Sequence, residues 1–318
     1  NWGTQKWILT KVLFLMKKIS IMILLASSFW GTAQERPEMN ELPPLEDGRD
    51  IPIINRIPAI ATDRPDITES AQITPVGWFQ YEGGYQFSHA EERISLTSIT
   101  DAHQIEEVLR FGINRKFEVR AVINANTKLV DIVDTWNDPF RTTGVNPVTI
   151  GFKYNLIEET DLLPQTTWLS HLTLPWIAGG DYRAPSQGNV VFHEQRIMLE
   201  KGLTPRLGIA SNVGVSGGMV GSNGFINEGM FSLALGYDLG NDYGVYAEYF
   251  SNWFVAGSQF FATPYFDGGF TKLLSNDLQL DIYAGVDLSP YVGSKLNTNG
   301  FFFGTGVSYR LPLAAYLK

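Results

Sequence analysis

From Gly77 to near its end, the sequence alternates apolar and polar residues with a period of two. This period places successive side chains on opposite faces of a β-strand. Turn-forming clusters divide the region into twelve segments of about 10 to 13 residues: 77–88, 104–113, 116–126, 147–156, 164–177, 190–201, 206–215, 228–239, 243–253, 259–271, 277–287 and 301–311. No stretch of this region has a sustained helical period. The pattern therefore predicts an all-β chain.

A soluble β-sandwich would also alternate, so three further features are needed to choose a fold. The segments are about as long as a tilted membrane strand must be, roughly 9–11 residues, whereas strands of globular proteins average about 5–6. Aromatic residues such as Trp168, Trp253 and Tyr309 stand near segment ends, as in the aromatic girdles of membrane barrels. Long and short connections alternate, with one exception at 254–258. Together these features predict a transmembrane antiparallel β-barrel of about twelve strands, of the outer-membrane type.

Composition excludes several other classes of protein. The chain has 318 residues, no cysteine and a net charge of -9. The lack of cysteine excludes thiol nucleophiles, Cys-ligated metals and disulfide scaffolds. The acidic balance gives no reason to expect nucleic-acid binding. A mean hydropathy of -0.05 is too polar for a bundle of membrane-spanning helices.

The N-terminus has the pattern of an export signal. Met16-Lys17-Lys18 precedes an apolar run that ends at Gly31-Thr32-Ala33, a small-x-small cleavage site. The alternative, a membrane anchor from Trp7 to Trp30, is disfavoured because lysines interrupt it. We therefore expect upstream read-through at 1–15, a cleaved signal peptide at 16–33, a periplasmic N-terminal segment and candidate plug at 34–75, a barrel at 76–312 and a tail at 313–318. The expected location is the bacterial outer membrane, with both termini in the periplasm.

A resemblance to a known family starts in the same region. Ala61-Thr62-Asp63-Arg64-Pro65-Asp66-Ile67-Thr68-Glu69-Ser70 leads into Gly77-Trp78-Phe79-Gln80-Tyr81-Glu82-Gly83-Gly84. These two motifs resemble the opening of the meta-pathway phenol-degradation family of outer-membrane proteins, which are also described as transporters. The closing Gly304-x-Gly306-Val-Ser-Tyr-Arg310 is similar to that family as well. The resemblance implies a passive channel or transporter for small molecules, including small aromatic or hydrophobic compounds.

Charged residues lie opposite the apolar stripe of most segments. An Arg or Lys on the lipid face costs about 2–4 kcal/mol near the bilayer midplane, so these residues should face the lumen. They are Glu82, Glu106, Arg110, Glu118, Arg120, Lys153, His171, Glu194, Arg196, Glu248, Asp281, Asp287 and Arg310. Two interpretations remain open: an internal ion-pair network that blocks the barrel, or a charged constriction that selects solutes. Glu107 falls on the apolar face, so it should lie near the rim or the register is shifted by one.

The N-terminal motif Asp63, Arg64, Pro65, Asp66, Thr68 and Glu69 is too charged to face lipid. We hypothesise that it lies at or inside the periplasmic mouth and pairs Arg64 with a luminal acid such as Glu82 or Glu106. The alternative is a solvated leader that assists export or assembly.

Catalysis is the rival class of function, because outer-membrane lipolytic enzymes are also barrels. Ser170 and His171 are adjacent in a strand and point to opposite faces, so they cannot form a catalytic pair. His193, on the apolar side of segment 190–201, is the one histidine that a serine of a neighbouring strand could reach, but no motif supports such a pair. His89 and His103 fall in the first predicted loop, and the four histidines have no metal-binding spacing. We therefore predict no enzyme activity, no cofactor and no metal. The expected partners are outer-membrane lipid, the barrel-assembly machinery and small-molecule solutes, and a closed structural or partner-binding barrel remains the alternative.

Overall fold

The computed structural model describes residues 58–65, 67–93, 96–133, 138–182, 191–219, 225–256, 259–289 and 298–313. The predicted read-through, signal peptide and most of the periplasmic segment lie outside the described residues, as do Asp66 and positions 314–318. Within the described part of the chain, no helix is long and apolar enough to cross a membrane.

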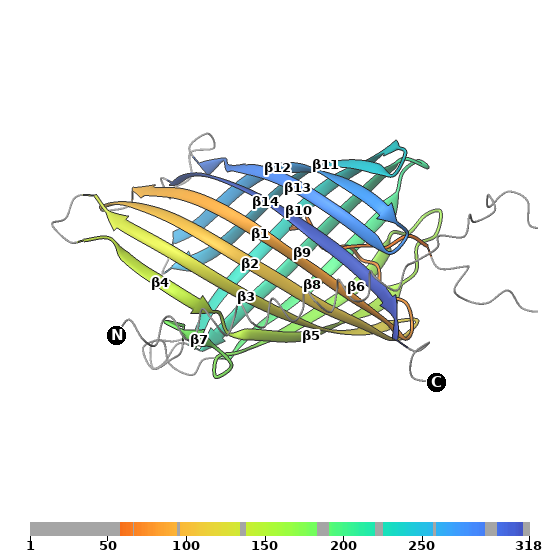
Figure 1. Cartoon of the computed structure of the whole chain (residues 1–318), viewed down its shortest axis with the longest axis horizontal. Helices are drawn as coiled ribbons and strands as arrows, with labels where there is room; N and C mark the ends of the chain where they lie inside the picture. Colours follow the sequence, from red (N-terminus) through yellow and green to blue (C-terminus); the bar gives the residue numbers. More distant parts are fainter. Residues whose placement is uncertain are drawn as a thin grey trace, which may run out of the picture. The chain divides into compact units, whose positions relative to one another are not determined.

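The described residues form fourteen strands, each paired with its neighbours in antiparallel fashion (Figure 1). They are β1 (Trp78–Arg93), β2 (Thr97–Asn114), β3 (Phe117–Ile132), β4 (Phe140–Val145), β5 (Val148–Ile157), β6 (Gln165–Leu174), β7 (Gly179–Gly180), β8 (Phe192–Gly202), β9 (Leu207–Met219), β10 (Phe225–Gly240), β11 (Tyr243–Ala256), β12 (Gln259–Ser275), β13 (Leu278–Asp287) and β14 (Thr298–Pro312).

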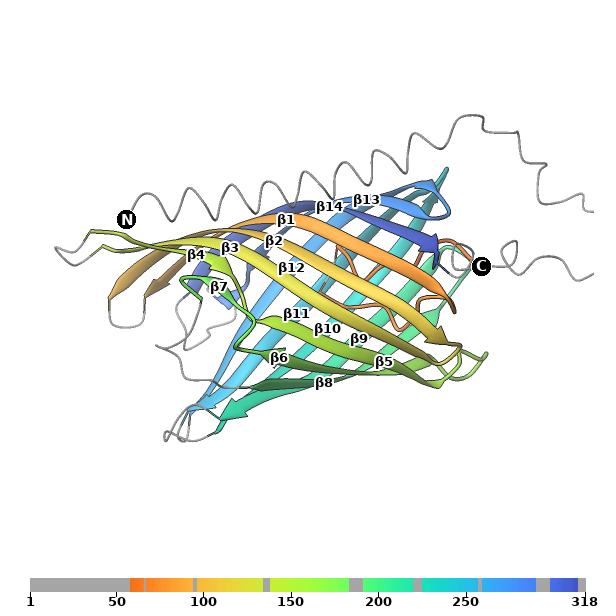
Figure 2. The same ribbon diagram turned by 60° about the horizontal axis from the view of Figure 1, so that its bottom comes forward.

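The strands close into a barrel of twelve wall strands. β1 pairs with both β2 and β14, and β2 pairs with β3, so no free edge remains around the wall (Figure 2). β4 and β5 both pair with β3 and act as one wall strand interrupted at Asn146–Pro147. Proline has no amide hydrogen and cannot continue the hydrogen-bond ladder. The short β7 pairs only with β4 and extends the wall beyond β6. The prediction of about twelve strands is confirmed.

The two ends of the barrel differ in their connections. At one end the turns are short, for example Arg115–Lys116 and Asn241–Asp242; we call this the short-turn end. At the opposite, long-loop end, the strands run further than predicted. The expected first loop, 89–103, is instead the paired tip of β1 and β2, which leaves only 94–96 as a connection. The alternation of apolar and polar residues disappears at these strand tips because polar residues occupy both faces, although the backbone pairing continues.

His89 and His103 therefore lie in strands and not in a loop, which corrects the prediction. His89 Nδ1 lies 2.7 Å from Asp101, and the Tyr85 hydroxyl lies 2.7 Å from His103 Nδ1. The predicted register holds, since Arg110 is buried inside the barrel. Glu107 lies on the outer face well within β2, where the Tyr81 hydroxyl donates to it at 3.4 Å.

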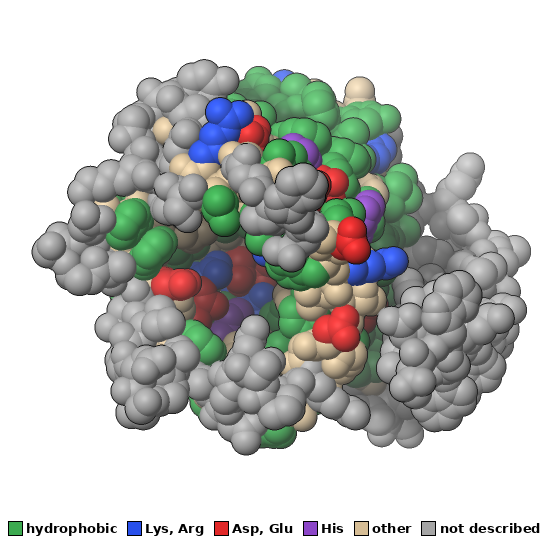
Figure 3. Space-filling model, turned by 90° about the vertical axis from the view of Figure 1, so that its left-hand side faces the viewer, with side chains coloured by type: hydrophobic (Ala, Val, Ile, Leu, Met, Phe, Trp, Pro, Cys, Tyr) green, Lys and Arg blue, Asp and Glu red, His purple; other side chains and the backbone are tan. Residues whose placement is uncertain are grey.

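The wall separates apolar from charged side chains. Outer positions such as Val119, Ile282 and Phe301 are exposed and apolar, whereas the inward neighbours Glu118, Arg120 and Asp281 are buried. From the long-loop end, Figure 3 shows a hollow with acidic, basic and histidine side chains on its floor. This polarity is inverted relative to a soluble protein and fits a barrel surrounded by lipid.

Candidate functional site

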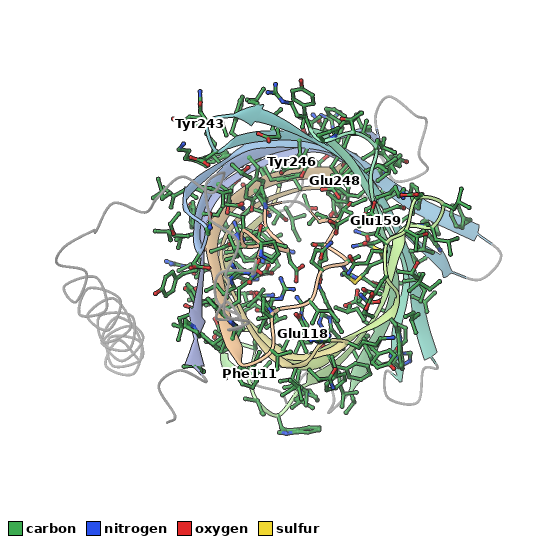
Figure 4. All side chains as sticks on the ribbon, turned by 90° about the vertical axis from the view of Figure 1, so that its right-hand side faces the viewer. Phe111, Glu118, Glu159, Tyr243, Tyr246 and Glu248 are labelled. Carbon is green, nitrogen blue, oxygen red and sulfur yellow. The ribbon has the colours of Figure 1, made fainter. Side chains whose placement is uncertain are left out.

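Residues 58–65 and 67–76, here together called the N-terminal segment, lie inside the barrel (Figure 4). Polar contacts join the segment to ten of the twelve wall strands through Glu82 (β1), Arg110 (β2), Glu118 and Arg120 (β3), Lys153 (β5), Thr167 (β6), Arg196 (β8), Ser232 (β10), Glu248 (β11), Asp281 (β13) and Arg310 (β14). In the view from the short-turn end, Glu118 and Glu248 point inward to the segment, and Tyr243 points away from the lumen.

The centre of the attachment is the carboxylate of Asp63. Lys153 Nζ lies 2.6 Å from Asp63 Oδ1, and Arg120 Nη1 lies 2.9 Å from Oδ2. Arg110 Nη1 approaches the same carboxylate at 3.3 Å. All four side chains are almost fully buried. One acid of the segment is thus shared by three cations that come from β2, β3 and β5.

Glu69 forms a second, adjacent ionic contact. Its oxygens lie 2.6 Å from Arg120 Nη1 and 3.3 Å from Arg196 Nη1. Burial by itself would raise the pKa of Glu69, but Arg120, Arg196 and Lys153 outweigh it and hold that pKa below its usual value. Glu69 therefore stays charged, and it ties the segment to the β3–β8 side of the wall.

Luminal side chains also satisfy the backbone of the segment. Glu118 accepts from Thr74 N at 2.7 Å, and Glu248 accepts from Thr68 N at 2.7 Å. The carbonyl of Ala71 accepts from Thr167 Oγ1 at 2.6 Å, and its amide donates to Glu200 at 2.9 Å. A buried backbone without secondary structure needs such partners, because each unpaired group costs free energy. The lumen is therefore complementary to this particular segment.

Arg64 occupies a slot between β1 and β14. Gly84 and Gly306 face each other in register, and a Cβ on either glycine would collide with the Arg64 guanidinium. From this slot Arg64 Nη2 reaches Asp281 Oδ1 at 3.4 Å, and the guanidinium lies 5.7 Å from the centre of the Tyr283 ring.

The partner of Arg64 differs from the expected Glu82 or Glu106. Glu82 accepts instead from the backbone amides of Asp63 and Arg64, at 2.8 and 3.2 Å, and pairs with Arg110 at 2.8 Å. The reason is positional: the main chain at 63–64 lies against β1, so the Arg64 side chain passes over the two glycines toward β13.

All thirteen predicted lumen residues occupy inward positions. Ten are buried: Glu82, Arg110, Glu118, Arg120, Lys153, His171, Glu248, Asp281, Asp287 and Arg310. Glu106, Glu194 and Arg196 are half-buried. Most of them belong to the contacts above, and His171 Nδ1 lies 2.9 Å from Glu194. Among the described residues, Asp287 is not part of the contacts with the segment given above and accepts a hydrogen bond from Ser289 N at 2.7 Å.

Sequence reasoning missed several luminal residues, among them Gln165, Glu200, Asp267 and Asp277. The alternation of Phe266 and Phe270 with Asp267 was a usable signal, but Pro264 and Gly268-Gly269 obscured it. Asp277 lies in a turn, where no period exists, and pairs with Arg310 at 2.7 Å.

The segment does not fill the lumen completely. A cavity of about 550 Å³ lies near the short-turn end, lined by Tyr246, Thr271 and Gln279. A second cavity of about 150 Å³ lies further toward the long-loop end, lined by Glu106, Asp267, Tyr283 and Phe302. Arg64 and Pro65 line both cavities and separate them.

The described part of the chain shows neither a metal site nor a pairing of Ser170 with His171. No group of three or more His, Asp or Glu side chains is arranged to hold a metal ion there. His171 faces the lumen beside Glu194, whereas Ser170 accepts from Gln195 Nε2 at 2.9 Å on the other face of the wall.

A closed antiparallel wall with an apolar exterior, a charged interior and an internal segment defines a β-barrel of the outer-membrane type. The chain belongs to the family described as "Putative MetA-pathway of phenol degradation", whose model matches residues 62–311. Comparison with curated proteins gives no match.

Solved structures share the fold at low sequence identity. The COG4313 outer membrane channel from Pseudomonas putida F1 is 12% identical with a TM-score of 0.59, covering 76% of this chain and 98% of that chain. The translocator domain of autotransporter NalP from Neisseria meningitidis is 9% identical with a TM-score of 0.50, covering 75% of this chain and 90% of that chain.

Proposed function

We propose that this protein is a passive outer-membrane channel for small molecules and that the N-terminal segment controls the passage of these molecules through the barrel. The observation that carries the proposal is the pair of cavities separated by Arg64 and Pro65. A solute path needs space inside the barrel, and here one arginine and one proline lie between two spaces along the same wall. Moving these two residues would join the cavities.

The comparisons support the same function. A protein of the same fold is described as an outer membrane channel, and the family description refers to phenol degradation. Small aromatic compounds are therefore the first solutes to test. Phe250, Tyr265, Tyr283 and Phe302 form an aromatic cluster inside the barrel, which suits such compounds.

In this proposal the short-turn end faces the periplasm, as in other outer-membrane barrels. The exported chain would lose residues 16–33, and both termini would lie in the periplasm. The assembly machinery and outer-membrane lipid are then its partners during biogenesis. No catalytic step is proposed, since most of the charged luminal groups are engaged in ion pairs and hydrogen bonds with the segment.

The test is planar-bilayer conductance of the refolded chain from Gln34, compared with a variant that lacks residues 59–70. We expect small or rare conductance steps from the full chain and larger, frequent steps from the deletion. The reversal potential in asymmetric salt would give the sign of the selectivity. If the deletion variant folds, as judged by its shifted gel mobility on heating, and still does not conduct, the channel proposal is wrong and a closed structural barrel is favoured.

A further inference from the structure

The luminal charges are divided unequally between the two sides of the barrel. The inward cations come from β2, β3, β5, β8 and β14: Arg110, Arg120, Lys153, Arg196 and Arg310. In contrast, the run of strands from β9 to β13 contributes four buried acids, namely Glu248 from β11, Asp267 from β12, and Asp281 and Asp287 from β13. Among the described residues of these five strands the only basic residue is Lys272, and its ammonium lies outside the lumen, 4.0 Å from the Tyr243 ring centre. One wall of the lumen is therefore acidic without its own counter-ions.

Asp267 is the least satisfied of these acids. It is 2% exposed, no amide, hydroxyl or cationic donor of the described residues reaches either of its carboxylate oxygens, and its hydrogen-bond neighbour is the carboxyl group of Glu248. The residue opposite it in register is another acid, Glu248, whose oxygens are engaged by the amides of Ile67 and Thr68. One oxygen of Asp281, Oδ2, also lacks a partner. Two facing buried carboxyl groups repel each other when both are charged, unless a proton or another cation lies between them, so this wall is complementary to a positive group.

Aromatic rings stand directly beside these acids. Phe250, Tyr265 and Tyr283 lie two positions further along the inward faces of β11, β12 and β13 than Glu248, Asp267 and Asp281, in the direction of the long-loop end. Phe250 stacks on Tyr265 with a centroid distance of 4.8 Å, and Phe302 lies 6.2 Å from both Phe250 and Tyr283. Ring faces attract cations, most strongly where water is excluded.

Part of this wall already holds a cation of the chain itself. The Arg64 guanidinium contacts Asp281 and lies over the Tyr283 ring at the border of the 150 Å³ cavity. Acid and ring together thus bind a planar organic cation at one place. The neighbouring combination of Asp267 with Phe302 lines the same cavity and has no such cation among the described residues.

We infer that this cavity is a binding site for a small organic cation, an ammonium group carried on an aromatic or short apolar body. The ammonium group lies against Asp267, and the apolar body packs on Phe302 and Tyr283. Solutes with a carboxylate are disfavoured by the excess of luminal acids. Neutral aromatic solutes lack a positive group that could lie against Asp267. The inference rests on the proposed channel function, because the cavity would lie on the path of the solute. It narrows the expected solutes to small organic cations.

The experiment is equilibrium binding to the refolded chain from Gln34 in detergent, measured by calorimetry with detergent-only titrations subtracted. The probes are benzylamine, benzyl alcohol and benzoate at neutral pH, which differ in charge on the same ring. We expect benzylammonium to bind at least ten-fold more tightly than benzyl alcohol and benzoate not to bind measurably. Equal binding of the alcohol or of benzoate would overturn the inference.

Variants then locate the site. Asp267→Asn keeps the shape and should weaken benzylammonium binding ten-fold or more, and Phe302→Leu should weaken it at least three-fold. Glu159→Gln, in the exposed turn between β5 and β6, is the control and should leave the affinity within two-fold. Unchanged affinity in both lumen variants would place the ligand elsewhere. If Asp267→Asn does not refold, the three probes and Phe302→Leu still decide the question.

The binding measurement and the conductance measurement test the two proposals independently. If benzylammonium binds as expected but the bilayer carries no current, the site stands and the channel proposal falls. If the barrel conducts but does not prefer the cation, the channel stands and this inference falls.

Discussion

Asp63 and Lys153 lie 2.6 Å apart, although 90 positions separate them in the sequence. Asp63 belongs to the N-terminal segment, and Lys153 belongs to the inner face of β5. Both are buried, and Asp63 also pairs with Arg110 and Arg120. This contact makes the segment a structural part of the barrel. The carboxylate of Asp63 is a counter-ion for buried cations of the wall, and the same ion pairs hold the segment in place.

Asp63→Asn should destabilise the protein strongly. The substitution leaves three buried cations without their shared anion, and breaking a buried pair in this way costs about 3–5 kcal/mol. We expect a lower temperature for the shift in gel mobility and faster proteolysis of the N-terminal segment. The control is Glu91→Gln, which removes a partly exposed pair with Arg93 and should change stability by less than about 1 kcal/mol. Similar stability of the two variants would contradict the central role of Asp63.

A disulfide should lock the segment to the wall. The hydroxyl oxygens of Thr68 and Ser232 lie 2.7 Å apart, and the chain has no cysteine that could interfere. The double variant Thr68→Cys/Ser232→Cys should therefore form a bond under mild oxidation and resist heating. Each single variant is a control. Conductance that appears only after reduction would show that the segment moves when the channel opens, whereas conductance unchanged by the bond would exclude that movement.

Gly84→Ala should displace Arg64. The added Cβ would collide with the guanidinium in its slot between β1 and β14, so the contact with Asp281 should be lost. We expect more frequent conductance steps than in the native chain, with a folded barrel. Gly208→Ala is the matched control, because a Cβ there meets only the Lys201 carbonyl oxygen at 3.8 Å. If Gly84→Ala conducts no more than Gly208→Ala, Arg64 does not hold the passage closed.

Ile282→Arg should impair insertion into lipid. Ile282 is 57% exposed on the outer face of β13, and an arginine on the lipid face costs about 2–4 kcal/mol near the midplane. The variant folded in liposomes should unfold at a lower urea concentration than the native chain. Leu162→Arg, at a position that is 91% exposed in the turn between β5 and β6, should be neutral. An equal loss in both variants would mean that the wall at Ile282 does not face lipid.

The alternation of side chains made the wall predictable from the sequence. Once Leu280 and Ile282 are set outward, Asp281 must point inward, because the period of a strand is two. That local rule placed all thirteen predicted charges on the inner face and the twelve strands in their order. It failed where its signal was absent: at the polar tips of β1 and β2, and at Asp267, close to Pro264 and Gly268.

The partners of those charges were decided only by the tertiary structure. The sequence motif around Asp63 and Arg64 indicated a segment inside the mouth, but the period of a strand says nothing about which luminal acid an incoming arginine meets. Closure of the barrel brings β1, β13 and β14 together, the glycine pair at 84 and 306 opens the slot, and Arg64 thereby meets Asp281. The acidic wall beside Phe302 has the same origin, since it is built from residues on separate strands that become neighbours only when the sheet closes on itself.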